Sequence, residues 1–482
     1  MSIDRSRDPL YAAIRPTERQ IAYQQTEFYG FIHFTVNTFT DREWGDGTES
    51  EALFNPAALD AEQWARTARD GGMKGLILTC KHHDGFCLWP SAHTEHSVKR
   101  SPYKNGQGDV VAETAAACRK YGLKFGVYLS PWDRNSPLYG SGKPYNDYFV
   151  AQLTELLTGY SDIFSVWLDG ACGEGPNGKR QTYDWPRYYE TVRSLQPNAC
   201  LCVCGPDVRW CGNEAGDTRP SEWSVVPRRL CRAETVEAKS QQADDASFRQ
   251  RRITSSDRDL GSREALRGED DLVWYPAEVN TSIRPGWFYH PSEDDQVKDF
   301  ETLRQVYLNS VGGNAMFLLN LPPDRCGLIH PADAASLGKL GRFIREAFRD
   351  NLAEAASISA GDALPGFGGE GLTAPSYETY FRTAEGRIEA RIDLEWPRAQ
   401  EIGYVVLQEN IRLGQRVERF AIACKGPEGE DVILREDTVV GYKRIVRLDR
   451  PVTTRRLSIL IRDARVFPTL AFIGVYGPWS ED

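Results

Sequence analysis

The sequence predicts a (β/α)8-like TIM barrel followed by an antiparallel β-sandwich. In the first part, short apolar runs alternate with amphipathic, helix-like stretches, an order typical of parallel strands joined by helices. After about residue 350, polar and apolar residues alternate, and Gly, Pro and Asp punctuate the chain at intervals of roughly ten residues. We therefore expect a barrel domain over residues 1–348 and a β-sandwich domain over residues 349–482.

Seven apolar runs are clear strand candidates for the barrel. They lack clean alternation, as strands that are buried on both faces do. A closed barrel needs an eighth strand, and residues 222–226 are a weak candidate for the sixth position, so we expect irregularity there. The seven runs are residues 28–34, 75–80, 124–130, 164–168, 200–204, 272–279 and 315–321, and the clearest helical stretches are residues 60–70, 110–121, 147–158 and 185–195.

Two segments outside the barrel strands need separate interpretation. Residues 234–271 are highly polar and predict a long excursion between barrel strands. Such loops are often lids or binding loops, but we favour a plain solvated insertion. For the sandwich we favour packing on the barrel over carbohydrate binding, because exposed aromatic clusters look few there. Its strand candidates are residues 387–394, 401–409, 416–424, 432–436, 444–448, 455–461 and 470–476.

Charge and hydropathy exclude some classes of function. The net charge is −10 and no long basic block occurs, which argues against nucleic-acid binding. No uninterrupted apolar stretch approaches the ~18 residues of a membrane span. The N-terminal residues contain no apolar signal-peptide core, so we expect a cytoplasmic protein, although an exported protein with its signal removed would look the same.

Neither a metal site nor a cofactor is predicted. The eleven cysteines form no CxxC pairs, so we expect buried free thiols in a reducing compartment. The adjacent His82 and His83 could bind a metal only with a third ligand, which His33 could supply in principle. Because no HExxH-like spacing is present, we favour hydrogen bonding to a substrate for this pair.

Polar, titratable and aromatic residues gather at the end of nearly every apolar run. The active site of a (β/α)-barrel lies at the carboxyl ends of its strands, so a cleft is expected there. Histidines and carboxylates can bind sugar hydroxyl groups, while Trp and Tyr offer flat faces to a pyranose ring. The residues at these ends include His33, Asn37, Glu43, Trp44, His82, His83, Tyr128, Trp132, Asp169, Arg209, Glu214, Trp274 and Glu278.

Glycoside hydrolysis needs two carboxyl groups beside the scissile bond. Asp169 is the best candidate nucleophile, because it directly follows a buried strand and Gly170 lets the backbone turn away. A plain Asp-Gly turn is the alternative. Position alone leaves Glu214, Glu222 and Glu278 open as the acid/base, and we prefer Glu214 because glycines near it let the backbone approach a ligand.

Five motifs resemble glycoside hydrolase family 29, the α-L-fucosidases. They are YGFIH at residues 29–33, EWGDG at 43–47, KHHDGF at 81–86, VWLDG at 166–170 and WCGNEAG at 210–216. The resemblance covers about residues 25–325 and implies a barrel followed by a β-sandwich, with an irregular sixth strand. It also implies a retaining mechanism in which the aspartate of the VWLDG motif, here Asp169, is the nucleophile.

Two of these motifs resemble one branch of the family in particular. EWGDG and GNEAG look like the branch that cleaves α-1,3- and α-1,4-linked fucose from branched Lewis-type glycans, and there the glutamate of GNEAG, here Glu214, is the acid/base. Phe34 departs from the family, in which a Trp often follows the first-strand histidine. The resemblance maps fucose binding onto His33, Glu43, Trp44, His82, His83 and Tyr128, with Trp274 and Trp287 as additional pocket walls.

The expected partner is a fucosylated oligosaccharide or glycoconjugate, and the oligomeric state is left open. Broader or α-1,2 linkage specificity remains an alternative, as does another glycosidase on the same barrel. A non-catalytic glycan-binding protein would keep the aromatic and histidine residues but lose a carboxylate, whereas both Asp169 and Glu214 are present. A metal-dependent hydrolase would lose activity to chelators.

Overall fold

The computed structural model describes residues 3–254 and 258–481 and confirms the predicted fold class. Eight parallel strands form a nearly closed barrel in the order β5-β4-β3-β2-β1-β10-β9-β6. A parallel bridge between Cys202 and Val208 brings the two ends of this sheet together. The strands are β1 (Phe28–Ile32), β2 (Gly75–Lys81), β3 (Lys124–Leu129), β4 (Ile163–Leu168), β5 (Cys200–Val203), β6 (Arg209–Trp210), β9 (Ala277–Ser282) and β10 (Met316–Asn320).

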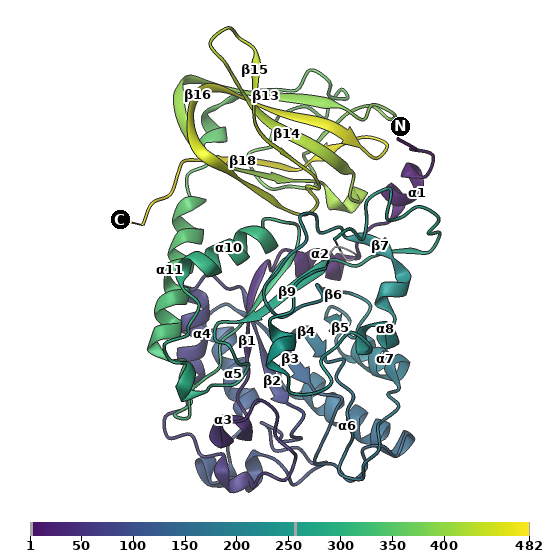
Figure 1. Ribbon diagram of the computed structural model, residues 1–482, viewed down its shortest axis with the longest axis vertical. Helices are drawn as coiled ribbons and strands as arrows, with labels where there is room; N and C mark the ends of the chain where they lie inside the picture. The colour runs from purple at the N-terminus through teal and green to yellow at the C-terminus, as the bar shows by residue number, and fades with distance from the viewer. Residues whose placement is uncertain (1–2, 255–257, 482) are drawn as a thin grey trace.

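Helices surround the barrel, and the four predicted stretches are confirmed as α4, α5, α6 and α7 (Figure 1). The side chains of Asp60, Asp109, Asp184 and Asp299 each accept a backbone N–H three residues on and so cap α4, α5, α7 and α10. Each such cap stabilises its helix by about 1 kcal/mol. The helices are α1 (Asp8–Ala13), α2 (Glu18–Gln24), α3 (Val36–Thr40), α4 (Ala61–Asp70), α5 (Val110–Lys120), α6 (Lys143–Gly159), α7 (Trp185–Leu195), α8 (Ala233–Glu237), α9 (Ala246–Arg249), α10 (Phe300–Ser310) and α11 (Pro331–Ala347).

The sixth barrel position is irregular, as expected, but residues 222–226, the candidate for it, do not fill it. The position is filled by β6, which follows β5 after only a short turn and has no helix before it. β7 (Val225–Pro227) instead pairs antiparallel with β8 (Leu272–Trp274) outside the barrel. The predicted run 272–279 therefore splits, because Pro276 has no N–H for a ladder and separates β8 from β9.

Antiparallel strands follow α11, as predicted for a β-sandwich. β13 and β16 pair along most of their length, and each merges two of the predicted strands across register shifts. One sheet has the order β11-β13-β16-β14-β15, with β18 also paired to β13, and β12 pairs with β17. The strands are β11 (Ser357–Ser359), β12 (Phe381–Arg382), β13 (Ala390–Gln408), β14 (Val417–Lys425), β15 (Asp431–Asp437), β16 (Arg444–Ala464), β17 (Thr469–Leu470) and β18 (Phe472–Tyr476).

The sandwich packs at the amino-terminal end of the barrel. Figure 1 shows it beside α2, which leads into β1, whereas α3, which follows β1, lies at the opposite end. Tyr442 and Lys443 of the sandwich bind the carboxylate of Glu27, which directly precedes β1. The carboxyl ends of the strands are thus left open. No helix in the described ranges is long and apolar enough to cross a membrane.

Candidate active site

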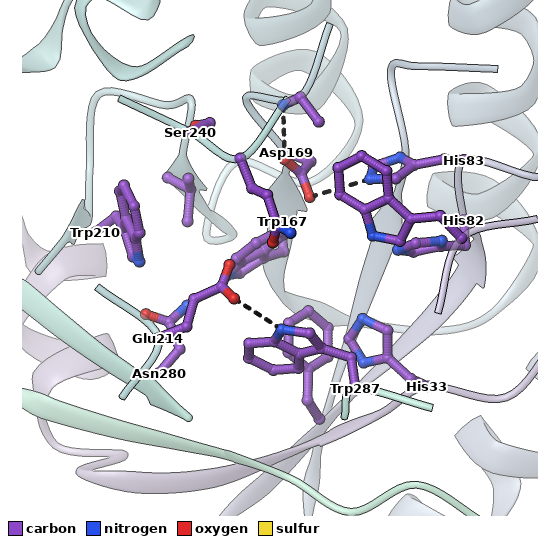
Figure 2. A pocket seen from close by; sticks show the side chains of 15 residues that line it. His33, His82, His83, Trp167, Asp169, Trp210, Glu214, Ser240, Asn280 and Trp287 are labelled. Atoms are coloured by element: carbon purple, nitrogen blue, oxygen red, sulfur yellow. Dashed lines mark hydrogen bonds and ion pairs between the residues drawn. The ribbon is translucent and has the colours of Figure 1, made fainter. Parts of the chain in front are cut away.

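A cavity opens at the carboxyl end of the barrel, where the sequence predicted a cleft. Seven of the predicted site residues line it, and Figure 2 shows their side chains around one space. His82 and His83 follow β2, Asp169 follows β4, and Glu214 lies in the loop after β6. The cavity is lined by Phe31, His33, Trp44, His82, His83, Trp167, Asp169, Ala171, Val203, Trp210, Glu214, Ser240, Gln241, Asn280 and Trp287.

Asp169 is the first residue after β4, and its carboxylate is held by two hydrogen bonds. The backbone N–H of Ala171 donates to Oδ1 at 2.7 Å, and the Tyr128 hydroxyl donates to Oδ2 at 3.0 Å. Burial raises the pKa of Asp169, and these two donors oppose the rise. Gly170 is needed for space, because a Cβ there would collide with the Ser240 hydroxyl. The carboxylate is therefore fixed in one orientation at the cavity wall.

Glu214 is presented by a loop that two glycines shape. Gly212 and Gly216 have positive φ angles of 106° and 75°, which side-chain-bearing residues rarely adopt. Between them, the Asn213 side chain accepts the backbone N–H of Ala215 at 3.1 Å. The glycines of the GNEAG motif are thus required by the backbone, and the loop points Glu214 toward the cavity.

The surroundings of Glu214 raise the pKa of its carboxyl group, as a general acid requires. Burial raises its pKa to about 7, and the negative charge of Asp169 acts in the same direction. The indole N–H of Trp287, which donates to Oε2 at 3.0 Å, opposes the rise. Figure 2 shows the Glu214 and Asp169 carboxyl groups facing the same space. Near neutral pH the cavity therefore holds a carboxyl group that can donate a proton, Glu214, beside a second carboxyl group that can ionise, Asp169.

His33 presents a hydrogen-bond acceptor to the cavity. The Asn320 amide nitrogen donates to Ser282 Oγ at 2.9 Å and to the Trp287 carbonyl at 2.7 Å, which leaves the Asn320 oxygen facing His33 Nδ1 at 2.8 Å. His33 Nδ1 must therefore carry the proton. Burial lowers the pKa of His33 to about 4, so the ring is neutral and Nε2 keeps its lone pair.

His83 is a second neutral histidine with a hydrogen-bond acceptor at Nε2. Ser130 donates its hydroxyl proton to the Trp132 carbonyl at 2.7 Å and therefore accepts from His83 Nδ1, also at 2.7 Å. Burial lowers the pKa of His83 to about 3, so the ring is neutral. His83 Nε2 lies 3.9 Å from Asp169 Oδ2. Because the ring is neutral, this contact is not a salt bridge, and both facing atoms are hydrogen-bond acceptors.

His82 and Asn280 carry polar atoms that the protein leaves unsatisfied. His82 Nδ1 and Asn280 Oδ1 are buried and have no hydrogen-bond partner among the described residues. Burial holds the pKa of His82 well below its usual value, so this ring is neutral as well. Unpaired buried polar atoms are costly, which favours a ligand with hydroxyl groups here. In the described parts of the chain, no three His, Cys, Asp or Glu side chains are grouped as metal ligands would be.

Flat aromatic rings form much of the cavity wall. Trp44 meets the His83 ring at a centroid distance of 4.9 Å and nearly perpendicular, at 83°. Trp287 lies 5.3 Å from the His33 ring. Phe31, Trp167 and Trp210 complete the wall but were not singled out from the sequence, although all three lie within the quoted motifs.

The polar excursion after β7 contributes to the cavity, so its interpretation as a plain solvated insertion is wrong. Ser240 and Gln241 line the cavity, and Gln242 receives the Cys172 N–H at 3.0 Å, beside Asp169. These residues belong to no motif. Their place in the site is evident only from how they pack over the end of β4, because the sequence of a loop does not indicate which part of the protein the loop covers.

Glu43 lies behind the cavity rather than in its lining. Its carboxylate accepts the backbone N–H groups of Trp287 and Phe288 at 2.9 and 3.0 Å and pairs with His290 at 2.8 Å. Burial alone would raise its pKa, but these contacts outweigh burial and lower it. Glu43 thus acts by positioning Trp287, which in turn holds Glu214.

Trp274 was predicted to be a pocket wall, and this prediction is wrong. The residue lies on β8, outside the barrel sheet, and packs in a separate apolar cluster with Tyr11 and Ile21. Its indole N–H donates to Gln24 at 3.0 Å. The split of the run 272–279 explains the error, since only the part after Pro276 enters the barrel.

The other two acid/base candidates are committed to buried partners. Glu278 accepts hydrogen bonds from Trp167 Nε1 at 2.9 Å and from the Tyr23 and Tyr29 hydroxyls, beneath the cavity wall. Glu222 pairs with Arg209 at 2.9 Å and with Arg219 at 3.1 Å. Burial raises the pKa of both, but the two guanidinium groups outweigh burial at Glu222 and lower its pKa. Of the three candidates, Glu214 alone lines the cavity.

We expect Glu222→Gln to lower the free energy of unfolding by about 3 kcal/mol, because it removes the buried carboxylate charge that pairs with Arg209 and Arg219. Denaturant unfolding followed by tryptophan fluorescence measures the loss. As a control, Glu395→Gln removes one partner of an exposed pair with Arg456, and its cost should stay below about 1 kcal/mol. Similar small losses in both variants would contradict a structural role for Glu222.

Comparisons with known proteins agree with the geometry. The α-L-fucosidase family model matches residues 15–347. Alpha-L-fucosidase 1 of Arabidopsis thaliana is 38% identical over 467 residues, which cover 96% of this chain and 87% of the plant protein. A solved Bacteroides ovatus protein assigned as an α-L-fucosidase is 44% identical with a TM-score of 0.85, covering 100% of this chain and 78% of that one. A Ruminococcus gnavus GH29 fucosidase, solved in complex with fucose, is 30% identical with a TM-score of 0.83, covering 97% and 96%.

Proposed function

The chain belongs to the α-L-fucosidase family of glycoside hydrolases, and we propose that it removes terminal α-1,3- or α-1,4-linked L-fucose from Lewis-type glycans with retention of configuration. One observation carries the proposal: Glu214, with a pKa of about 7, lines the same cavity as Asp169. A retaining glycosidase needs this combination of a proton donor and a carboxylate nucleophile.

In the first step, Asp169 attacks the anomeric carbon and forms a fucosyl ester while Glu214 protonates the leaving oxygen. The hydrogen bonds from Ala171 and Tyr128 fix the attacking carboxylate. Burial of Glu214 and the charge of Asp169 keep the proton on Glu214 until it is needed. No water has to fit between the two groups, so we expect the carboxyls about 5 Å apart.

In the second step, Glu214 acts as a base. Once Asp169 is an ester its negative charge is gone, and the pKa of Glu214 falls because that charge had helped to raise it. Glu214 then takes a proton from water, which attacks the anomeric carbon from the face that the leaving group occupied. Asp169 is released as a carboxylate and fucose leaves with its original configuration.

The fucose ring binds among the neutral histidines. His33 Nε2 and His83 Nε2 each accept a hydrogen bond from a sugar hydroxyl, and His82 Nδ1 is a further unpaired site. Trp44 and Trp287 supply the apolar faces of the pocket. The fucose complex of the Ruminococcus gnavus relative supports fucose as the sugar. Tyr128 acts through Asp169, and Glu43 acts through Trp287.

The linkage proposal is tested by comparing two substrates. We expect free fucose from a Lewis-type trisaccharide and at least about tenfold less from 2′-fucosyllactose, because discrimination of a wrongly placed aglycone typically reaches that size. Proton NMR of the first product formed should show α-fucose before mutarotation. Preferential release from 2′-fucosyllactose would overturn the linkage, and β-fucose would overturn retention. No release from either substrate would favour a glycan-binding protein.

A further inference from the structure

A second cavity adjoins the first at Glu214 and Trp287. It has a volume of about 540 Å³, and Glu214 and Trp287 line both cavities. The acid must reach the leaving oxygen, so the sugar that carries fucose lies beside Glu214, which borders this space. The second cavity is lined by Glu214, Ala215, Ala246, Arg249, Gln250, Arg252, Thr281, Ser282, Arg284, Pro285, Trp287 and Lys298.

The lining of the second cavity is cationic. Arg249, Arg252, Arg284 and Lys298 contribute four positive groups, and the one acidic side chain among its described residues is Glu214. The pKa of Glu214 is about 7, so this carboxyl carries little negative charge in mildly acid solution. The lining therefore offers charged N–H donors of the kind that bind an anion.

Two of these groups have hydrogen-bonding capacity that the protein does not use. Lys298 Nζ donates to the Ser282 carbonyl at 2.6 Å, and burial lowers its pKa to about 8, a shift that the charge of Glu293 opposes. Arg284 is fully buried and pairs with Asp333 and Asp294, but its Nη2 has no partner among the described residues. A partly buried ammonium and an unpaired guanidinium N–H are costly to desolvate.

The other two cations lie on the polar excursion, at or after the end of α9. Arg249 pairs with Asp244 at 3.0 Å and stands 3.8 Å from Glu43. Arg252 is 69% exposed, and its nearest acid is Asp217 at 3.8 Å. Arg252 is thus held only loosely and is free to turn toward a ligand.

We propose that this second cavity binds an anionic substituent, a sulfate ester or a carboxylate, on the glycan from which fucose is removed. The inference rests on the proposed function, because that function places the leaving sugar beside Glu214. Both oxyanions accept charge-assisted hydrogen bonds from Lys298 and Arg252. Acidic fucosylated glycans are therefore the preferred substrate class.

Binding tests the inference without relying on turnover. Calorimetry on the Asp169→Ala protein compares a neutral Lewis-type trisaccharide with its 6-sulfated and its sialylated forms. We expect at least one acidic glycan to bind about tenfold more tightly, the gain of one charge-assisted hydrogen bond. A gain with the sulfated form alone identifies a sulfate site, and a gain with the sialylated form alone identifies a carboxylate site. Equal or weaker binding of both overturns the inference, whether or not the protein hydrolyses fucosides.

Substitutions then assign the preference to this cavity. In the same calorimetric comparison, Lys298→Met and Arg252→Gln should each reduce the ratio of acidic to neutral affinity by about fivefold or more, since each removes one charged donor. Lys298→Arg should retain most of the ratio. Lys339→Met changes an exposed lysine on α11 that pairs with Glu481, and it should leave the ratio as it is. A ratio unchanged in both cavity variants would refute the assignment.

Discussion

Asp169→Ala is expected to reduce kcat/KM for fucoside hydrolysis by a factor on the order of 10⁴ or more, because the covalent route needs this carboxylate. Release of fucose from an aryl fucoside and from a Lewis-type trisaccharide should fall together. The measurement is the initial rate with each substrate. Asp162→Ala is the matched control, since Asp162 is exposed just before the opposite end of the same strand, and it should keep full activity.

Chemical rescue distinguishes a lost nucleophile from a damaged fold. The shortened side chain leaves room for azide, which should attack the anomeric carbon from the face that Asp169 occupied. The expected product is the β-fucosyl azide, of inverted configuration, together with partial recovery of the rate. Retention of more than about 1% of the activity without azide would place the nucleophile elsewhere.

Glu214→Ala has the second largest expected effect, and the effect depends on the leaving group. Hydrolysis of the trisaccharide should slow by about 10³-fold, because an alkoxide must be protonated as it leaves. An aryl fucoside with an acidic phenol needs no such help and should lose far less in the bond-breaking step. Comparing the two substrates by kcat/KM measures the difference. Equal losses on both would contradict the role of acid.

The pH profile supplies an independent readout for Glu214. Glu214 acts as acid only when protonated, and its pKa is about 7, so activity is present below that pH and is lost as the pH rises through it. Asp169 must be ionised, and burial raises its pKa, so activity also falls in acid at a pH above the usual aspartate range. The wild type should give a bell-shaped profile. Glu214→Ala should lack the alkaline limb, and azide should yield the α-fucosyl azide.

The local sequence was sufficient to predict site residues that stand directly after a strand or within a tight loop. Asp169 is adjacent to a buried run, and the GNEAG loop has glycines where the backbone needs positive φ angles. The helices beginning after Asp60 and Asp109 were also predictable, because capping and helical periodicity act within a few residues. Such features depend on contacts between near neighbours, which a sequence displays.

Other features depend on which distant segment a residue meets. β6 is two residues long, too short to show a periodicity in the sequence. The backbone N–H groups of Arg209 and Cys211 hold it in place by donating to the carbonyls of Pro276 and Glu278. Position left three glutamates open as the acid/base, and in the structure Glu222 pairs with two arginines while Glu278 accepts hydrogen bonds from two tyrosines and a tryptophan. Of the three, Glu214 is the one that lines the cavity.

The two-part fold, the strand that directly precedes Asp169 and the loop that carries Glu214 could thus be predicted from the sequence. The contacts of the folded chain were needed to show that Glu43 supports Trp287, that Trp274 lies outside the cavity, and that the polar excursion covers the site. The physical reason is that burial, ion pairing and pKa arise from contacts between segments far apart in the chain. Those contacts exist only once the barrel has closed.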